Sequence, residues 1–168
     1  MDLETKILSK SIQELLYNSD KKIGTAESCT GGRLAEALIA VPGSSNYFNG
    51  SIIAYTNEVK ENLLGVDHQV LEEQTAVSEE VARQMVLGAI KTLRVDFAVA
   101  VTGVAGPAGG TPENPVGTIW IGYGCNTDVR TWKLSEDFGR DINLSIATSK
   151  ALQLMVEFLK EHESDLKK

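Results

Sequence analysis

The sequence is poor in histidine and cysteine and has no excess of positive charge. Its 168 residues include 2 histidines and 2 cysteines, and the net charge is −7 at pH 7. Cys29 and Cys125 lack the spacing of metal ligands and do not indicate a disulfide framework. The negative charge disfavours nucleic acid and anionic membranes as main partners, because both require a basic surface. A small anionic substrate needs only a local positive pocket, so it stays compatible with this composition.

Long hydrophobic runs are also missing. No apolar run is long enough to span a bilayer, and the charged, amphipathic N-terminal stretch lacks the apolar centre of a signal peptide. We therefore expect a cytoplasmic protein. A length of 168 residues, with 42% hydrophobic and 23% charged residues, is typical of one globular domain spanning residues 1–168.

Helical and strand patterns alternate along most of the chain. Apolar residues recur every three or four positions after Ser78, a good helix N-cap, whereas residues 96–103 form the continuous apolar run of a buried strand. This order predicts an α/β fold, a single compact layered sandwich with a mixed β-sheet flanked by helices. The expected helices span residues 4–17, 33–40, a short segment capped by Asn57, 79–93 and about 144–158, and the expected strands span 23–26, 51–56, 96–103, 118–123 and 129–134.

Three segments rich in hydroxyls and glycines are candidates for a ligand site. They are residues 27–32 ("ESCTGG"), 101–107 ("VTGVAGP") and 42–45 ("PGSS"). Loops at the carboxyl end of a sheet are the usual ligand sites of α/β folds, and glycines let backbone N–H groups approach a ligand. Neither a Walker loop nor a dinucleotide fingerprint is present. Each segment is equally compatible with an ordinary tight turn.

The reactive side chains do not indicate histidine-based or metal-based catalysis. His68 and His162 lie in polar, surface-like segments, so we expect no Ser-His-Asp triad and no metal site. Cys29 is either a nucleophile or a packing residue. The remaining candidate mechanism is a serine nucleophile activated by a lysine, because a buried lysine can serve as a base. Lys60 is the candidate base and Arg140 the candidate phosphate ligand, although both residues also fit solvent-exposed positions on helices.

Six motifs occur in the order found in one known family. They are "AESCTGG", "VPGSS", "AYTNEVKENLLGV", "AVSEEVA", "VTGVAGPAGGTPENPVGT" and a late "FGR". From about residue 5 to residue 160, the chain resembles the CinA C-terminal domain family. The resemblance implies a compact α/β sandwich and nicotinamide-nucleotide amidase activity. Such an enzyme converts nicotinamide mononucleotide to nicotinic acid mononucleotide and ammonia, without a cofactor or a metal.

The resemblance also assigns residues. It implies a catalytic group in which Ser45 is the nucleophile, Lys60 is its base and Tyr55 lies beside them. It implies a substrate-binding role for a further set, in which Arg140 faces the phosphate: Ser28, Thr30, Gly31, Gly32, Thr102, Gly103 and Arg140. Ser28 is the alternative nucleophile.

The chain departs from the family pattern at one point. Where members often carry a second arginine about four residues after the first, this chain has Asn143 or Leu144. A non-catalytic nucleotide-binding or protein-interaction module of the same fold is therefore the alternative function. As partners we expect a small-molecule nucleotide substrate, no nucleic acid and no membrane, and we expect a homo-oligomer such as a dimer.

Overall fold

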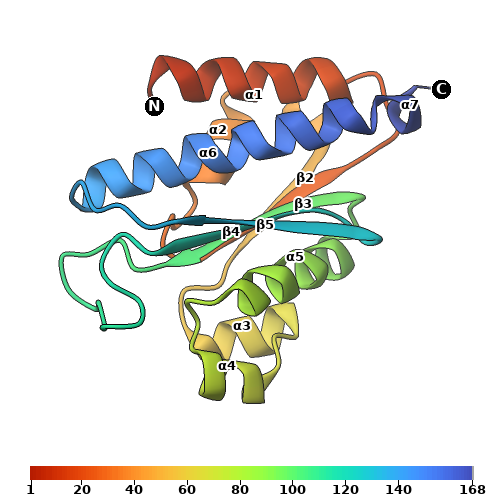
Figure 1. The fold of residues 1–168 in the computed structure, drawn as a ribbon. Helices are drawn as coiled ribbons and strands as arrows, with labels where there is room; N and C mark the ends of the chain where they lie inside the picture. The colour runs from red at the N-terminus through yellow and green to blue at the C-terminus, as the bar shows by residue number, and fades with distance from the viewer. Residues whose placement is uncertain (168) are drawn as a thin grey trace.

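A five-stranded mixed β-sheet runs through the middle of the computed structural model, which describes residues 1–167 (Figure 1). The strands are β1 (Ile23–Glu27), β2 (Phe48–Ile53), β3 (Phe97–Gly103), β4 (Ile119–Cys125) and β5 (Asp128–Leu134). Their order across the sheet is β2-β1-β3-β4-β5. β1 is parallel to both β2 and β3, whereas β4 is antiparallel to β3 and to β5. The predicted mixed sheet and α/β fold are confirmed.

Helices cover both faces of this sheet. One face carries α1 (Leu3–Leu16), α2 (Arg33–Ile39) and α6 (Arg140–Glu161), and the other carries α3 (Asn57–Leu64), α4 (His68–Gln74) and α5 (Glu79–Leu93) (Figure 1). The 3-10 turn η1 (Ser44–Asn46) precedes β2, and the short helix α7 (Glu163–Leu166) follows α6. The α2 crossover and the α3–α5 crossover therefore lie on opposite faces of the sheet.

The side chains of β3 alternate between the two faces of the sheet and contribute to two separate hydrophobic cores. Phe97, Val99 and Val101 pack with α1, α2 and α6, whereas Ala98 and Ala100 pack with α5 and α3. Successive side chains of a strand point to opposite faces, so one strand supplies both cores. This explains why residues 97–102 are all buried and why the sequence of β3 is continuously apolar.

Small residues let α5 approach the sheet and α3 closely. A Cβ atom on Gly122 of β4 would lie 2.6 Å from the backbone oxygen of Ala82 in α5. A Cβ on Gly88 of α5 would lie 2.0 Å from the backbone oxygen of Leu64, at the end of α3. Neither neighbour is a flexible side chain, so both positions require glycine. The position of α3, which carries Lys60, thus depends on this close packing.

Side-chain caps fix the starts of four helices. Asp2, Thr56, Asp67 and Ser78 accept hydrogen bonds from backbone N–H groups in the first turns of α1, α3, α4 and α5. Such caps satisfy backbone donors that have no partner within the helix. The predicted cap at Ser78 is confirmed. The cap of α3 is Thr56, one residue earlier than expected, because its Oγ1 accepts from the N–H of Val59.

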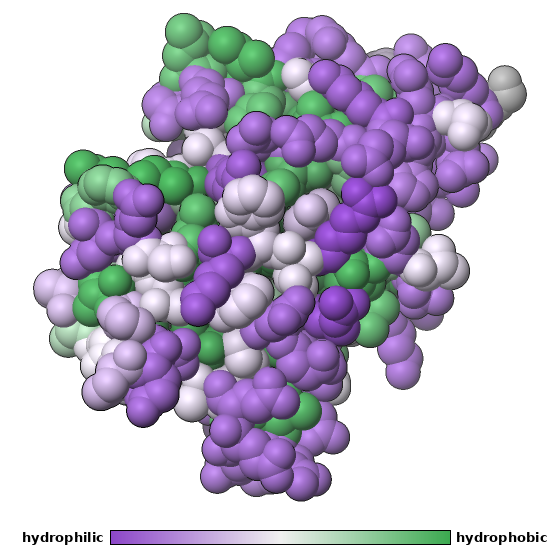
Figure 2. All heavy atoms as spheres, viewed as in Figure 1, coloured by the Kyte–Doolittle hydropathy of each residue, from purple (hydrophilic) through white to green (hydrophobic). Residues whose placement is uncertain are grey.

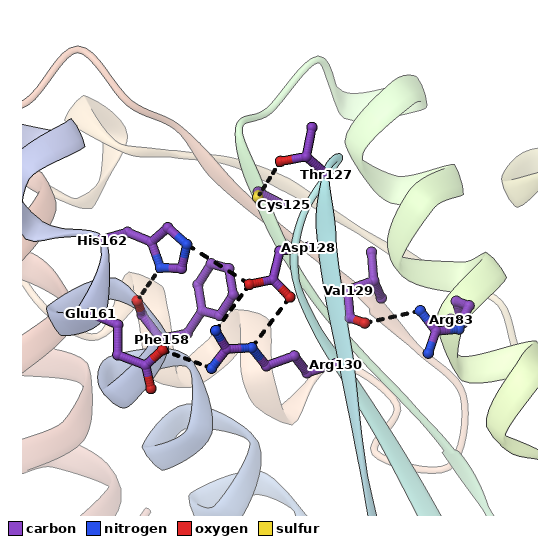
Figure 3. A network of polar contacts seen from close by, with 9 residues as sticks. All are labelled: Arg83, Cys125, Thr127, Asp128, Val129, Arg130, Phe158, Glu161 and His162. Carbon is purple, nitrogen blue, oxygen red and sulfur yellow. Dashed lines mark hydrogen bonds and ion pairs between the residues drawn. The ribbon is translucent and has the colours of Figure 1, made fainter.

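A polar network joins β5 to the end of α6. Arg130 forms ion pairs with Asp128 (2.9 Å) and Glu161 (2.8 Å), and its guanidinium lies over the ring of Phe158 (Figure 3). The ring of His162 stacks on the ring of Phe158, with the two ring centroids 4.1 Å apart. His162, expected in a surface-like segment, is only partly exposed, because Phe158 covers one side of its ring and the backbone oxygen of Phe158 is hydrogen-bonded to Nδ1.

The face of the molecule seen in Figure 2 is largely polar. Figure 2 shows mainly hydrophilic residues on the viewed side, with a hydrophobic group at the N-terminal end of α1. Leu3 and Ile7 of this helix are 72% and 57% exposed. Among residues 1–167, no helix has both the length and the apolar character needed to cross a membrane.

Candidate active site

The carboxyl ends of the three parallel strands meet at one edge of the sheet. Ser28 follows β1 directly, and Thr102 and Gly103 end the neighbouring strand β3. The chain leaves β2 at Ile53 and enters α3, which carries Lys60. β1 lies between β2 and β3, so the two crossovers diverge there. Crevices at such points are the usual ligand sites of open α/β sheets.

Ser28 and Lys60 are in direct contact at this edge. Lys60 Nζ lies 2.9 Å from Ser28 Oγ and donates a second hydrogen bond of 2.9 Å to the backbone oxygen of Ala54. Both side chains are buried, Lys60 to 1% exposure. Since Ser28 N–H donates to Val101 and Ala54 N–H donates to Glu27, the backbone of β1 and its two neighbours fixes this pair.

Burial changes the proton affinity of Lys60. Removal of its charge from water lowers the pKa of the amine from 10.5 to about 8, and no carboxylate touches the amine to oppose this effect among the described residues. The amine is therefore partly neutral close to physiological pH. In its neutral form it can accept the proton of the Ser28 hydroxyl, the arrangement that a lysine base requires.

A buried carboxylate shapes the bend that carries Ser28. Glu27 is 0% exposed, and its oxygens accept hydrogen bonds from Thr30 Oγ1 (2.8 Å) and from the backbone N–H groups of Gly32, Leu34 and Ala35. These N–H groups belong to the start of α2, so Glu27 caps this helix from within the sheet. The N-terminus of α2 is thereby occupied and is not free to bind a substrate anion.

Thr102 and Gly103 lie beside the Ser28–Lys60 pair, which we call the dyad. Thr102 Oγ1 donates to the backbone oxygen of Ala76 (2.8 Å), which ties β3 to the segment before α5. A Cβ atom on Gly103 would lie 2.6 Å from Ile119 Cα in β4. Glycine at position 103 is therefore required by the packing of the sheet, and both residues line the pocket.

Arg140 lies at the first position of α6, across the pocket from α3. Its Nη1 donates to the backbone oxygen of Gly106 at 2.8 Å, and its other N–H groups have no hydrogen-bond partner within residues 1–167. Tyr55 lies at the mouth with 60% of its surface exposed. The structure thus brings both residues to the same cavity as Ser28 and Lys60.

The cavity between these groups has a volume of about 310 Å³. This is at the lower end of the range for small-ligand sites, about 300–1,000 Å³. Among the described residues that line it, Lys60 and Arg140 carry the only charged side chains, and both are cations. A protein with a net charge of −7 therefore presents a locally positive pocket.

Ser45 lies elsewhere. It is exposed and belongs to η1, which precedes β2, so it lies at the amino end of the strand. Lys60 and Ser28 lie at the carboxyl end of the parallel sheet, and the five residues of β1 separate the two ends by roughly 15 Å. The structure does not bring Ser45 to Lys60, and the expected Ser45–Lys60 pair is corrected to Ser28–Lys60.

Three further predicted residues support the bend and do not line the cavity. Thr30 bonds to Glu27, and Gly31 and Gly32 adopt positive φ angles of 56° and 108° that favour glycine. Cys29 does line the cavity, but burial raises the pKa of its thiol to about 11. A thiol with this pKa carries little thiolate at neutral pH, so Cys29 is a poor nucleophile.

Comparison with known proteins identifies the family. The sequence model of the CinA C-terminal domain matches residues 5–159. The chain belongs to the CinA C-terminal domain family. It is 44% identical over 151 residues to a CinA-like protein of Thermosynechococcus vestitus, covering 88% of this chain and 36% of that protein. A CinA-like protein of Cytophaga hutchinsonii is 42% identical over 154 residues, covering 92% of this chain and 37% of that protein.

Solved structures of the CinA superfamily share the fold. The competence/damage inducible protein CihA from Agrobacterium tumefaciens has a TM-score of 0.90 and 35% identity, covering 94% of this chain and 99% of that chain. The competence damage-inducible protein A from Klebsiella pneumoniae has a TM-score of 0.89 and 31% identity, covering 93% and 97%. This CinA domain spans little more than a third of the curated relatives it matches.

Sequence analysis missed several residues of the candidate site. Asn57, Ala76 and Val77 line the cavity, as do Ala108 and Gly109 of the loop after β3. Asn57 had a usable signal, since it lies three residues before Lys60 on the same helix. Glu27 had no such signal, because a glutamate at the end of a strand does not show which N–H groups it will meet.

Proposed function

We propose that this CinA domain is an amidohydrolase that converts nicotinamide mononucleotide and water to nicotinic acid mononucleotide and ammonia, a reaction of pyridine nucleotide salvage. Ser28 is the nucleophile and Lys60 is the base. One observation carries this proposal: Lys60 Nζ lies 2.9 Å from Ser28 Oγ in a pocket that no acidic side chain of residues 1–167 lines. Family membership supports it, because the resemblance implies the same activity.

Acylation begins with neutral Lys60. Its amine takes the proton from Ser28 as Oγ attacks the carboxamide carbon of the substrate, and a tetrahedral oxyanion forms. The backbone N–H of Cys29, the residue after the nucleophile, donates to no other residue among residues 1–167 and is the candidate donor to this oxyanion. Lys60 then gives the proton to the departing nitrogen, so ammonia leaves and an ester on Ser28 is left.

Deacylation repeats these steps with water. Lys60, neutral again after ammonia leaves, removes a proton from a water molecule that attacks the ester carbon. The ester bond breaks, Lys60 returns the proton to Ser28 Oγ, and the carboxylic acid product gives its remaining proton to solvent and leaves as a carboxylate. The hydrogen bond from Lys60 to the backbone of Ala54 holds the amine in place through both half-reactions. No metal or cofactor takes part in any step.

Arg140 and Tyr55 supply the recognition in this proposal. Arg140 has free N–H groups at the rim of the pocket, and a guanidinium binds phosphate oxygens through charge-assisted hydrogen bonds. Tyr55 presents an exposed ring at the mouth, where it can stack on the pyridine ring. Glu27 occupies the start of α2, which favours the α6 side of the pocket as the place of the phosphate.

The test is release of ammonia from nicotinamide mononucleotide by the purified chain, compared with its Lys60→Arg variant. Arginine keeps the positive charge but stays protonated, so it cannot act as the base. We expect turnover by the wild type and a loss of at least about 100-fold in kcat for the variant. Full activity of the variant would exclude a lysine base. Binding of the nucleotide without any ammonia release by the wild type would favour the non-catalytic alternative.

A further inference from the structure

Two side chains of α6 hold the pocket wall that faces the dyad. This wall is the loop after β3, and its residues Ala105 and Gly106 line the cavity. Arg140 Nη1 donates to the oxygen of Gly106 at 2.8 Å, and Asn143 Nδ2 donates to the oxygen of Ala105 at 3.1 Å. Two consecutive carbonyl groups of the wall are thus bound by two residues one helical turn apart.

Asn143 is the buried member of this pair. Only 3% of its surface is exposed, and its amide makes three hydrogen bonds. Nδ2 donates to Ala105 and to Asp137 Oδ1 (2.9 Å), while Oδ1 accepts from the N–H of Phe138 (2.9 Å). Both amide hydrogens therefore have acceptors. If the amide oxygen and nitrogen were exchanged, the NH₂ group would face the N–H of Phe138, and the oxygen would face the oxygens of Ala105 and Asp137. The amide has a single orientation.

Asn143 therefore joins three segments that meet at the start of α6. They are the pocket wall at Ala105, the approach to the helix at Asp137 and Phe138, and the helix itself. Asp137 Oδ1 also accepts from the N–H of Gly139, the residue before Arg140. Asn143 does not line the cavity of the dyad, so it cannot touch a substrate bound there.

We infer that Asn143 is a positioning residue for recognition of the substrate phosphate, because it fixes Arg140 and the Ala105–Gly106 wall as one unit. This inference rests on the proposed function. Arg140 is exposed and has many rotamers, and its orientation toward the pocket depends on the Gly106 carbonyl group staying in place. A preorganised arginine loses less conformational entropy when it binds phosphate than a mobile one does.

Asn143→Asp tests this inference. Aspartate has nearly the same shape and keeps the acceptor for Phe138, but it has no donor for Ala105 and adds a charge next to Asp137. We expect kcat/KM for nicotinamide mononucleotide to fall about tenfold, mainly through KM, which corresponds to loss of one or two hydrogen bonds. For nicotinamide riboside, which has no phosphate, the loss should be below about threefold.

A matched control and a double mutant separate positioning from stability. Asn49 is an exposed asparagine on β2 whose Nδ2 also donates to backbone oxygens, those of Leu93 and Arg94. Asn49→Asp should leave both substrates within about twofold of wild type. Adding Arg140→Ala to Asn143→Asp should cost less than the same change costs in the wild type, because the arginine is already misplaced.

Several outcomes would overturn the inference. Equal losses for the two substrates, or fully additive losses with Arg140→Ala, would mean that Asn143 supports only the fold. If Asn143→Asp does not fold, Asp137→Ala takes its place, since Asp137 is exposed and its removal frees the same amide; it should raise KM for the nucleotide about threefold. An unchanged KM in that variant would contradict the inference.

Failure of the proposed function is a separate result. If the wild type releases no ammonia, the amidase proposal fails whatever the variants do. Titration calorimetry with nicotinamide mononucleotide then measures the role of Asn143 directly. Weaker binding by Asn143→Asp and unchanged binding by Asn49→Asp would support positioning of Arg140, whereas equal binding by both variants and the wild type would refute it.

Discussion

Replacing Lys60 by methionine should make the protein more stable and inactive. Lys60 is 1% exposed, and burial lowers the pKa of its amine from 10.5 to about 8. Each pKa unit corresponds to about 1.4 kcal/mol, so the charged form destabilises the folded state by about 3 kcal/mol at neutral pH. Methionine has a similar length and no charge, which removes this cost.

Two lost hydrogen bonds reduce the gain. Lys60 donates to Ser28 and to the backbone oxygen of Ala54, and each bond contributes about 1 kcal/mol to stability. The expected net effect at pH 7 is therefore a stabilisation of about 1–2 kcal/mol. A buried lysine that weakens the fold is the stability cost of a base held ready for catalysis.

The direction of the pKa shift of Lys60 determines how its contribution to stability changes with pH. The folded pKa lies below the unfolded pKa, so the native state binds fewer protons between pH 8 and 10.5, and wild-type stability contributed by Lys60 rises with pH across this window. The advantage of Lys60→Met should accordingly be largest below pH 8 and be gone by about pH 10.5. Other groups titrate there as well, so the difference between variant and wild type is the quantity to compare.

Urea unfolding at pH 7 and pH 10 measures these differences. The control is Lys91→Met, an exposed lysine in the last turn of α5, which should change stability by less than about 0.5 kcal/mol at either pH. A Lys60→Met variant that is less stable than wild type at pH 7, or whose effect does not change with pH, would refute the reasoning about the buried amine.

Three further predictions follow from the structure. Gly88→Ala should destabilise the protein by more than about 2 kcal/mol in urea unfolding, because the clash with the backbone of Leu64 outweighs the roughly 1 kcal/mol that alanine gains in a helix; a neutral effect would contradict the close packing. Glu27→Gln should lower the thermal midpoint and kcat together, since an amide nitrogen would face the N–H groups at the start of α2, and an unaffected kcat would separate Glu27 from Ser28. The rate kcat/KM should rise about tenfold per pH unit below pH 8 and level off above it, as Lys60 loses its proton, and a flat profile would exclude it as the base.

Most secondary structure was predictable because its signals are local. The apolar run at residues 96–103 became β3 (Phe97–Gly103), and the periodic segment after Ser78 became α5. The helix α4 (His68–Gln74) was not predicted, because seven residues give barely two turns of periodicity and its polar sequence resembles a loop. β2 begins at Phe48, before the predicted residue 51, since the asparagine and glycine residues near its start are typical of turns.

The site was harder to predict because it depends on topology. Ser28, Thr102 and Arg140 come together only because β1 and β3 are neighbours and α6 returns across them. Ser45 illustrates a signal that was available: its loop precedes a parallel strand, so it lies at the opposite edge from loops that follow strands. The pairing of Lys60 with Ser28 could not be read from the sequence, because 32 positions separate the two residues.

Several expectations stay predictions. They are the cytoplasmic location, the homo-oligomer, the nucleotide substrate, the exclusion of nucleic acid and membranes as partners, and the extent of a single domain over residues 1–168. The relatives nearly three times as long show which family the chain belongs to, but they do not test these expectations.

The most direct measurement of the central claim compares ammonia release from nicotinamide mononucleotide by Ser28→Ala and Ser45→Ala. Both variants remove one hydroxyl oxygen, and Ser45 serves as the matched control at the other end of the sheet. Thermal unfolding of each variant establishes that it is folded. If Ser28 is the nucleophile and Lys60 is its base, Ser28→Ala releases no ammonia above background and Ser45→Ala keeps at least about half of the wild-type kcat. An active Ser28→Ala enzyme together with an inactive, folded Ser45→Ala enzyme would contradict the account.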